Sequence, residues 1–213
     1  MGSVGGALDR GPLSSPWPEA AQGRGPKPTV GGSITGLGFV AGLLAILIGA
    51  YQLFGTGILT SHAQARLRKT PIAAHAHLGA PVARLLIPSI HLDVMVVEGV
   101  GMKQLAEGPG HYPQSAPIGS QGVTAIAGHS SGWGAPFMHF DRLLEGATVI
   151  VDAKRHEYRY VITHRGVVKP ADVWVLNGDP WSSAPSKLVL TTCWPIFSSK
   201  ERLILWGDLV SFS

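Results

Sequence analysis

The sequence predicts an all-β domain of about eight short strands with a few short helices, preceded by a single N-terminal transmembrane helix. Two observations predict this. Residues 34–59 form an apolar run, within a stretch from Pro28 to Ala65 that contains no Lys, Arg, Asp or Glu. From Pro81 onward, short runs rich in β-branched and aromatic residues are separated by Gly, Pro, Asn and Asp, which is typical of a barrel or a sandwich.

The N-terminal third of the chain divides into three parts. Residues 1–33 contain eight Gly and five Pro without apolar periodicity, so we expect a disordered, cytoplasmic tail. About 20 apolar residues suffice to cross a bilayer as a helix, and the run over 34–59 is also longer than the core of a cleaved signal peptide. We therefore expect a transmembrane helix there, followed by a juxtamembrane spacer over 60–80. Basic residues flank the run on both sides, so charge alone does not orient it.

Composition excludes several classes of protein. Hydrophobic residues make up 45% of the 213 residues, too many for a chain that is disordered throughout. The net charge of +4 resides in residues 1–84, which carry seven basic and two acidic residues, whereas residues 85–213 carry ten and eleven. The folded part therefore lacks the basic excess of a nucleic-acid-binding domain. A single cysteine excludes an internal disulfide and a zinc site made of cysteines.

The strands are expected within residues 81–213, which are long enough to fold alone. Each run alternates or is continuously apolar and ends at a turn-forming residue. The expected strands are Val82–Ile87, Leu92–Val97, Val123–Ala127, Thr148–Asp152, His156–Thr163, Asp172–Leu176, Lys187–Thr192 and Arg202–Leu209. Only Met102–Leu105 and Phe137–Leu144 have a helical pattern.

The candidate nucleophile is Cys193, the only cysteine of the chain. It follows the strand Lys187–Thr192, and Trp194 and Pro195 end that strand at once, since proline supplies no ladder donor. The sulfur is thereby placed at the rim of the sheet. A buried structural cysteine is the alternative, although an unpaired thiol outside the cell favours a purpose.

Two further residues also stand at strand ends. A thiol becomes a nucleophile with the help of a base, and His129 ends the run Val123–Gly128 before a glycine-rich loop. Arg202 opens the strand that follows Cys193, where its guanidinium fork suits a developing oxyanion or a substrate carbonyl.

Taken together, these segments resemble the signatures of the sortase family. The resemblance rests on Thr124-Ala-Ile-Ala-Gly-His129, Leu190-Thr-Thr-Cys193 and Arg202-Leu-Ile-Leu205. It extends over about residues 82–210. Gly108-Pro-Gly-His-Tyr112-Pro and the Cys-x-Pro-x-Phe-Ser run after the nucleophile are most similar to the class E sortases of actinobacteria.

The resemblance implies a fold, a reaction and partners. The fold would be the eight-stranded sortase barrel, and the chain a membrane-anchored cysteine transpeptidase with its catalytic domain outside the cell. Cys193 would cleave a Leu-Ala-x-Thr-Gly or Leu-Pro-x-Thr-Gly sorting signal on a secreted protein between Thr and Gly. The resulting thioester would pass to an amine of a peptidoglycan precursor or a pilin. No metal or organic cofactor is implied.

Roles for single residues follow from the same resemblance. His129 would act as general base and acid, and Arg202 would stabilise the oxyanion. Tyr112 would read the second position of the signal. Substrate-binding roles are implied for Tyr112, Thr124, Ser130, Thr192 and Trp194.

Two other readings remain open. Gly128-His-Ser130-Ser-Gly132 matches the G-x-S-x-G nucleophile elbow, which would make the protein a serine hydrolase that uses Ser130. That motif requires a helix after the serine, and Gly-Trp-Gly-Ala-Pro disfavours one. The other reading is an anchored β-barrel that binds peptides without catalysis.

Overall fold

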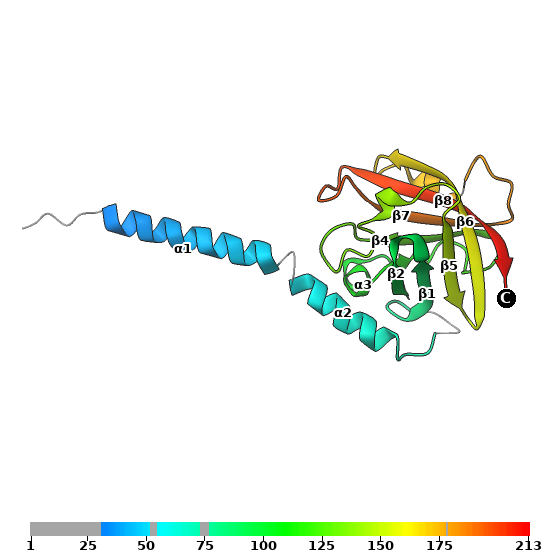
Figure 1. Cartoon of the computed structure of the whole chain (residues 1–213), viewed down its shortest axis with the longest axis horizontal. Helices are drawn as coiled ribbons and strands as arrows, with labels where there is room; N and C mark the ends of the chain where they lie inside the picture. The colour runs from blue at the N-terminus through cyan, green and yellow to red at the C-terminus, as the bar shows by residue number, and fades with distance from the viewer. Residues whose placement is uncertain (1–30, 52–54, 73–76, 178) are drawn as a thin grey trace, which may run out of the picture. The chain divides into compact units, whose positions relative to one another are not determined.

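The structure is a computed structural model and describes residues 31–51, 55–72, 77–177 and 179–213 (Figure 1). The predicted tail over 1–33 lies outside these residues, except that 31–33 begin helix α1. The chain separates into two compact units, residues 1–42 and 43–213, and the second holds helix α2 and all the strands.

Two helices occupy the region of the predicted transmembrane segment. Helix α1 is Gly31–Ala50, and helix α2 is Thr56–Leu67. Among the residues that the structure describes, no helix has both the length and the hydropathy needed to cross a membrane. The single helix expected over 34–59 is therefore not observed: its last residues belong to α2, whose Thr56 is only 2% exposed.

Helix α2, which covers part of the predicted juxtamembrane spacer, packs on the barrel. The Gln64 amide donates to the Met95 and Glu107 carbonyls at 3.0 and 2.8 Å, and its Oε1 accepts from the Met95 amide at 2.7 Å. Leu67 is buried against Met95 and Val97. Part of the expected spacer over 60–80 thus belongs to the folded domain.

Eight strands close into a barrel, which confirms the predicted fold class (Figure 1). They are β1 (Pro81–Ile87), β2 (Leu92–Glu98), β3 (Gly110–His111), β4 (Gly122–Gly128), β5 (Thr148–Ala153), β6 (His156–Val168), β7 (Ser186–Trp194) and β8 (Glu201–Phe212). Around the barrel the order is β1-β2-β3-β4-β7-β8-β6-β5, with β5 paired back to β1. Closing the sheet on itself is a usual way for a small all-β domain to limit exposed strand edges.

The helical segments that follow the first strand are short. Helix α3 (Met102–Glu107) confirms the first predicted helical piece, and the second contains only the 3-10 turn η3 (Phe140–Arg142). A further 3-10 turn, η2 (Pro88–Ile90), connects β1 to β2.

One predicted strand is wrong. Residues Asp172–Leu176 were expected to pair in the sheet, but Val173–Asn177 form the 3-10 turn η4. The apolar side chains of this turn, Val175 and Leu176, pack on Trp206 from outside the barrel. Its hydrophobic run thus reflects a buried face rather than a strand. The eighth strand is instead the two-residue β3, too short to leave a periodic signal.

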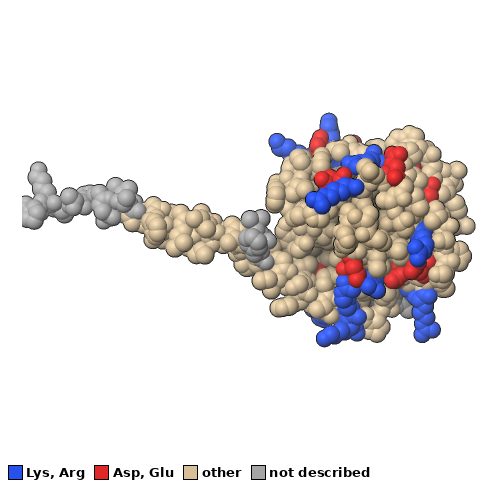
Figure 2. Space-filling view, viewed as in Figure 1, with Lys and Arg blue, Asp and Glu red and all other residues tan. Residues whose placement is uncertain are grey.

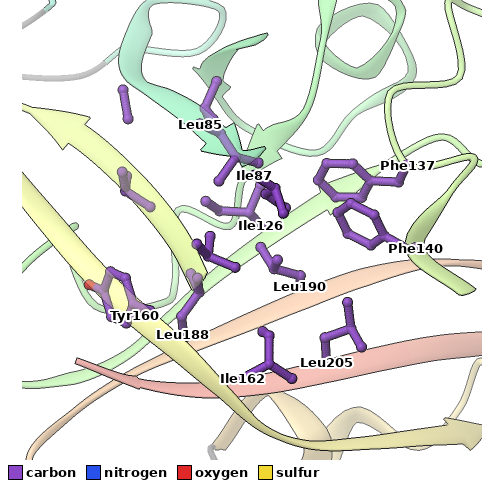
Figure 3. Packing of buried hydrophobic residues seen from close by; sticks show 14 of the residues in the cluster. Leu85, Ile87, Ile126, Phe137, Phe140, Tyr160, Ile162, Leu188, Leu190 and Leu205 are labelled. Atoms are coloured by element: carbon purple, nitrogen blue, oxygen red, sulfur yellow. The ribbon is translucent and has the colours of Figure 1, made fainter. Parts of the chain in front are cut away.

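The main core fills the inside of the barrel (Figure 3). Leu188 and Leu190 of β7, Ile126 of β4 and Leu205 of β8 are fully buried there. Phe137 and Phe140 close one side, with their rings stacked at a centroid distance of 3.8 Å. The burial of so many large side chains supplies the main driving force for folding.

A second, smaller cluster lies on the outside of β4, β7 and β8. It contains Ala125, Val189, Ile204 and Trp206, covered by Val175 of η4. Since side chains alternate along a strand, these positions face away from the main core. Strands β4, β7 and β8 are therefore covered on both faces.

Charged residues on the barrel form small mixed groups. On the face shown in Figure 2, Lys and Arg side chains lie next to Asp and Glu, without a continuous basic patch. Arg84, for example, forms two hydrogen bonds to the carboxylate of Asp93, at 2.8 and 2.7 Å. This distribution agrees with the near-neutral charge of residues 85–213.

Candidate active site

His129 and Cys193 meet because β4 and β7 are parallel neighbours. Gly128, the last residue of β4, lies opposite Thr192 in the register. The next residue along each strand is His129 in one case and Cys193 in the other. Both therefore stand at the same end of the barrel, although 64 positions separate each pair in the sequence.

Arg202 joins them through the antiparallel pairing of β7 with β8. Its Cα is the direct partner of the Cα of Cys193. Counting by twos from the outer cluster, Val189 leads to Cys193 and Ile204 leads to Arg202, so both side chains lie on the outward face. Cys193 is half-buried and is the last residue but one of β7, so it lies at the rim of the sheet, as the sequence predicts.

The imidazole of His129 is partly buried. Burial lowers the pKa of His129 below its ordinary value, because the charged ring is less well solvated there. Its Nε2 is buried and has no hydrogen-bond partner among the described residues. A neutral imidazole with a nitrogen not engaged by the barrel is suited to exchange a proton with a thiol.

The guanidinium of Arg202 is fixed by the backbone of the loop that precedes it. Its Nη1 donates to the carbonyls of Ser199 and Glu201, at 3.0 and 2.9 Å. In the part of the chain that the structure describes, these bonds use one nitrogen of a group with several donors. A fixed guanidinium beside the sulfur can stabilise negative charge on a carbonyl oxygen.

Tyr112 is the predicted binding residue that the structure brings to this group. Burial raises the pKa of the Tyr112 phenol, the positive charge of Arg202 opposes that effect, and Cys193 adds to it. The phenol therefore lies within electrostatic reach of both catalytic candidates. Its segment is held by His111, whose Nδ1 lies 2.9 Å from a carboxylate oxygen of Glu98 in the barrel wall.

Thr124 and Thr192 are held within the barrel wall. Thr124 is 1% exposed, lies opposite Leu188 and donates to the Ala116 carbonyl at 3.1 Å. This register places it about four residues from the end of β4, apart from Cys193. The Thr192 hydroxyl donates to the Gly128 carbonyl at 2.8 Å. Both hydroxyls therefore bond to backbone that supports the site rather than to its surface.

Ser130 and Trp194 lie beside the catalytic candidates. Trp194 is partly buried against the main core. Ser130 is 2% exposed, and its hydroxyl has no partner among the described residues. The segment after it, Gly132–Ala135, has positive φ throughout, which is the opposite hand to an α-helix. The nucleophile elbow needs a right-handed helix here, so the structure does not support a serine nucleophile.

Two small residues next to the catalytic candidates were not singled out from the sequence. The outward positions before Cys193 and His129 are Thr191 and Ala127, which are small and buried. Counting back by twos from each catalytic candidate would have identified them.

Gly128 is required by packing rather than by backbone conformation. Its φ is not among the positive ones, but a Cβ at this position would lie 2.6 Å from the Phe137 ring. The glycine is needed for this close approach.

The described residues contain no group of three or more His, Cys, Asp or Glu side chains that could hold a metal ion. Cys193, His129 and Arg202 make a nucleophile, a base and an anion-stabilising group. This constellation supports acyl transfer through a thiol.

The sequence matches a known protein family. Residues 85–210 match the family model described as the sortase domain. The chain is 29% identical over 191 residues to sortase SrtE1 of Streptomyces coelicolor, covering 79% of this chain and 54% of the relative. It is 32% identical over 130 residues to sortase SrtE2 of the same organism, covering 55% and 51%. The chain thus spans about half the length of these relatives.

Solved structures are similar as well. Sortase E from Streptomyces avermitilis superimposes with a TM-score of 0.58 at 35% identity, covering 64% of this chain and 92% of that one. Sortase E1 from Streptomyces coelicolor, solved with a tripeptide in the active site, gives a TM-score of 0.59 at 29% identity, covering 65% and 93%.

Proposed function

Because the chain belongs to the sortase family, we propose that it is a cysteine transpeptidase acting on proteins that carry a sorting signal. The observation that carries this proposal is the register of β4, β7 and β8, which brings His129, Cys193 and Arg202 to one end of the barrel. The half-buried sulfur and the accessible rim fit a reaction on an extended peptide.

In the first step, Cys193 Sγ attacks the carbonyl carbon between Thr and Gly of the signal. His129 takes the thiol proton, and Arg202 stabilises the oxyanion of the tetrahedral intermediate. When the intermediate collapses, the C–N bond breaks and His129 returns the proton to the leaving glycine nitrogen. The product is a thioester between the threonine carbonyl and Cys193, with a free glycine-led fragment.

In the second step, an amine attacks the thioester carbonyl. His129 accepts the amine proton, the C–S bond breaks, and the proton returns to the sulfur. A new amide joins the substrate protein to the amine, and the free thiol is restored. The acceptor we propose is an amino group of a peptidoglycan precursor or of a pilin.

The proposed signal is Leu-Ala-x-Thr-Gly or Leu-Pro-x-Thr-Gly. Two features support selection at its second position. Tyr112 lies within electrostatic reach of Cys193 and Arg202, and the outward residues before the two catalytic candidates, Ala127 and Thr191, are small. An aromatic side chain beside small residues can distinguish substrate side chains by size.

We further propose that the enzyme is anchored in the cell membrane by the part of the apolar run over 34–59 that precedes α2, with its barrel on the outer side. Support comes from the uncharged stretch Pro28–Ala65 and from the exposed apolar side chains of α1, among them Leu43, Leu47 and Ile48. Cys193 is the only cysteine, so a membrane-impermeant maleimide tests the location directly. Labelling of intact cells supports it, and labelling only after lysis contradicts it.

The activity is tested with the full chain in detergent and paired peptides that differ only in Ala or Pro at the second signal position. An amine acceptor is added, and products are identified by mass spectrometry. We expect cleavage between Thr and Gly and a new amide to the acceptor. Peptide binding without cleavage would favour the non-catalytic β-barrel, and hydrolysis that persists in Cys193→Ala would contradict the mechanism.

A further inference from the structure

The loop that carries His129 contains a strained left-handed turn. Four consecutive residues have positive φ: Gly132 at 63°, Trp133 at 47°, Gly134 at 69° and Ala135 at 41°. Glycine adopts this region freely, but Trp133 and Ala135 do so only with strain. Strained backbone persists where surrounding structure enforces it, and it is concentrated at functional sites.

Helix α2 holds this turn from outside. The Trp133 amide donates to Thr56 Oγ1 at 3.0 Å. One turn further along α2, Thr60 is 6% exposed, and its side chain lies against Gly134 so closely that an added Cβ would approach it to 3.3 Å. A cavity of about 670 Å³ is lined by α2 and by the loop from Gly134 to Pro136. Helix α2 contacts the turn through Thr56 and Thr60.

Both ends of the loop are fixed to each other and to the core. The Phe137 amide donates to the His129 carbonyl at 2.9 Å, and the Phe137 ring is buried against Gly128 and Phe140. Only Ser130 and Ser131 separate the left-handed turn from His129 in the chain, so a change in the turn reaches the residues next to the imidazole first.

The imidazole itself depends on its backbone for orientation. In many nucleophilic sites a third side chain holds the base. His129 Nε2 has no hydrogen-bond partner within the described part of the chain, so the ring is placed by the loop and its packing.

We propose that Thr56 is a positioning residue for His129, acting through the left-handed turn Gly132–Ala135. The inference rests on the proposed transpeptidase activity. Helix α2 includes the last residues of the apolar run over 34–59 and precedes the barrel in sequence, so this contact links the end of that run to the proposed general base.

The test is steady-state kinetics of the full chain with the Leu-Ala-x-Thr-Gly peptide. Thr56→Val removes the acceptor of the Trp133 amide at nearly constant shape, and Thr56→Ser keeps it. Ser61→Ala is the matched control on the same helix, since Ser61 is exposed and bonds only locally to the Ile58 carbonyl. Assays are run well below the melting midpoint of each variant, so that kcat refers to folded protein.

We expect Thr56→Val to lower kcat about tenfold with KM changed less than about twofold, because a misplaced base weakens the transition state more than substrate binding. Thr56→Ser should recover most of this loss, and Ser61→Ala should match wild type. Ala135→Gly in the Thr56→Val background should restore part of kcat, because glycine adopts a φ near 41° without strain. If the contact with α2 only stabilised the fold, Ala135→Gly in the loop would not restore kcat.

The inference is overturned if Thr56→Val keeps kcat within about twofold of wild type, or if Thr56→Ser is as impaired as Thr56→Val. If Thr56→Val does not fold, Thr56→Ala removes the same oxygen and gives the same comparison. An inactive wild-type chain would contradict the proposed function, whereas an active wild type with an equally active Thr56→Val contradicts the positioning role alone.

Discussion

Strands β4, β7 and β8 show two different faces to the rest of the molecule. Their inward side chains, such as Ile126, Leu190 and Leu205, are fully buried in the main core (Figure 3). Their outward side chains pass from the small apolar cluster around Val189 to Cys193 at the rim. One face is filled with large aliphatic groups, and the other ends in a nucleophile.

This difference separates stability from chemistry along the same backbone. Alternation assigns successive residues to opposite faces, so Thr192 bonds to the Gly128 carbonyl while Cys193 stands on the other side. Substitutions on the inward face should therefore change the free energy of unfolding, and those at the rim of the outward face, at Cys193 and Arg202, should change turnover.

The largest expected effect is the loss of the nucleophile on the outward face. Cys193→Ala should reduce turnover of the signal peptide by about four orders of magnitude or more. The melting midpoint and the affinity for peptide should stay close to wild type, because the side chain is half-buried at a rim. Kinetics, thermal melting and a binding titration check these three quantities. Residual turnover near the wild-type rate would remove Cys193 from the mechanism.

Arg202→Lys tests the second outward residue. We expect kcat to fall on the order of a hundredfold, because an ammonium keeps the charge but cannot reproduce the guanidinium fork. The fixed position of Arg202 against the Ser199 and Glu201 carbonyls is also lost. Steady-state rates near those of wild type would show that charge alone is sufficient.

Leu190→Ala tests the inward face of the same strand. Leu190 is fully buried, and its truncation should lower the free energy of unfolding by about 2–5 kcal/mol. At a temperature where the variant is folded, kcat should remain close to wild type. Denaturant unfolding and kinetics together check the separation of the two faces, which a large fall in kcat at full folding would disprove.

The smallest expected effect is in the titration of His129. Burial lowers its pKa, so the ring should titrate below the ordinary value of about 6.5. The unfolded chain then binds a proton first as pH falls, so the stability due to the neutral buried ring is present above about pH 6.5 and is lost as pH falls through the lowered pKa. Imidazole NMR of Cys193→Ala across this range checks the direction. A midpoint at or above the ordinary value would contradict a buried neutral base.

The sequence was sufficient for features set by local pattern. Strand ends near His129 and Cys193 follow from alternation and from the proline after Trp194. The spacing of the strands indicates a barrel or a sandwich, and the resemblance to the sortases implies the eight-stranded barrel. Asp172–Leu176 was misassigned because a short apolar run that packs on Trp206 from outside looks like a strand.

Features set by distant packing could not be predicted. The bond from Trp133 to Thr56 joins residues 77 positions apart, and nothing in either segment indicates the other. The packing of the Phe137 ring over Gly128 is likewise not indicated by the local sequence. In both cases the tertiary contact, and not local propensity, determines the backbone.

The proposed transpeptidation requires that Cys193 forms the covalent intermediate beside His129 and Arg202. It is tested most directly with a signal peptide that carries an electrophile in place of the amide between Thr and Gly. After reaction with the full chain, peptide mapping by mass spectrometry locates the adduct. We expect modification of Cys193, which should be slower in His129→Ala and absent in Cys193→Ala. An adduct on Ser130, or no adduct on an enzyme that turns over the peptide, would contradict it.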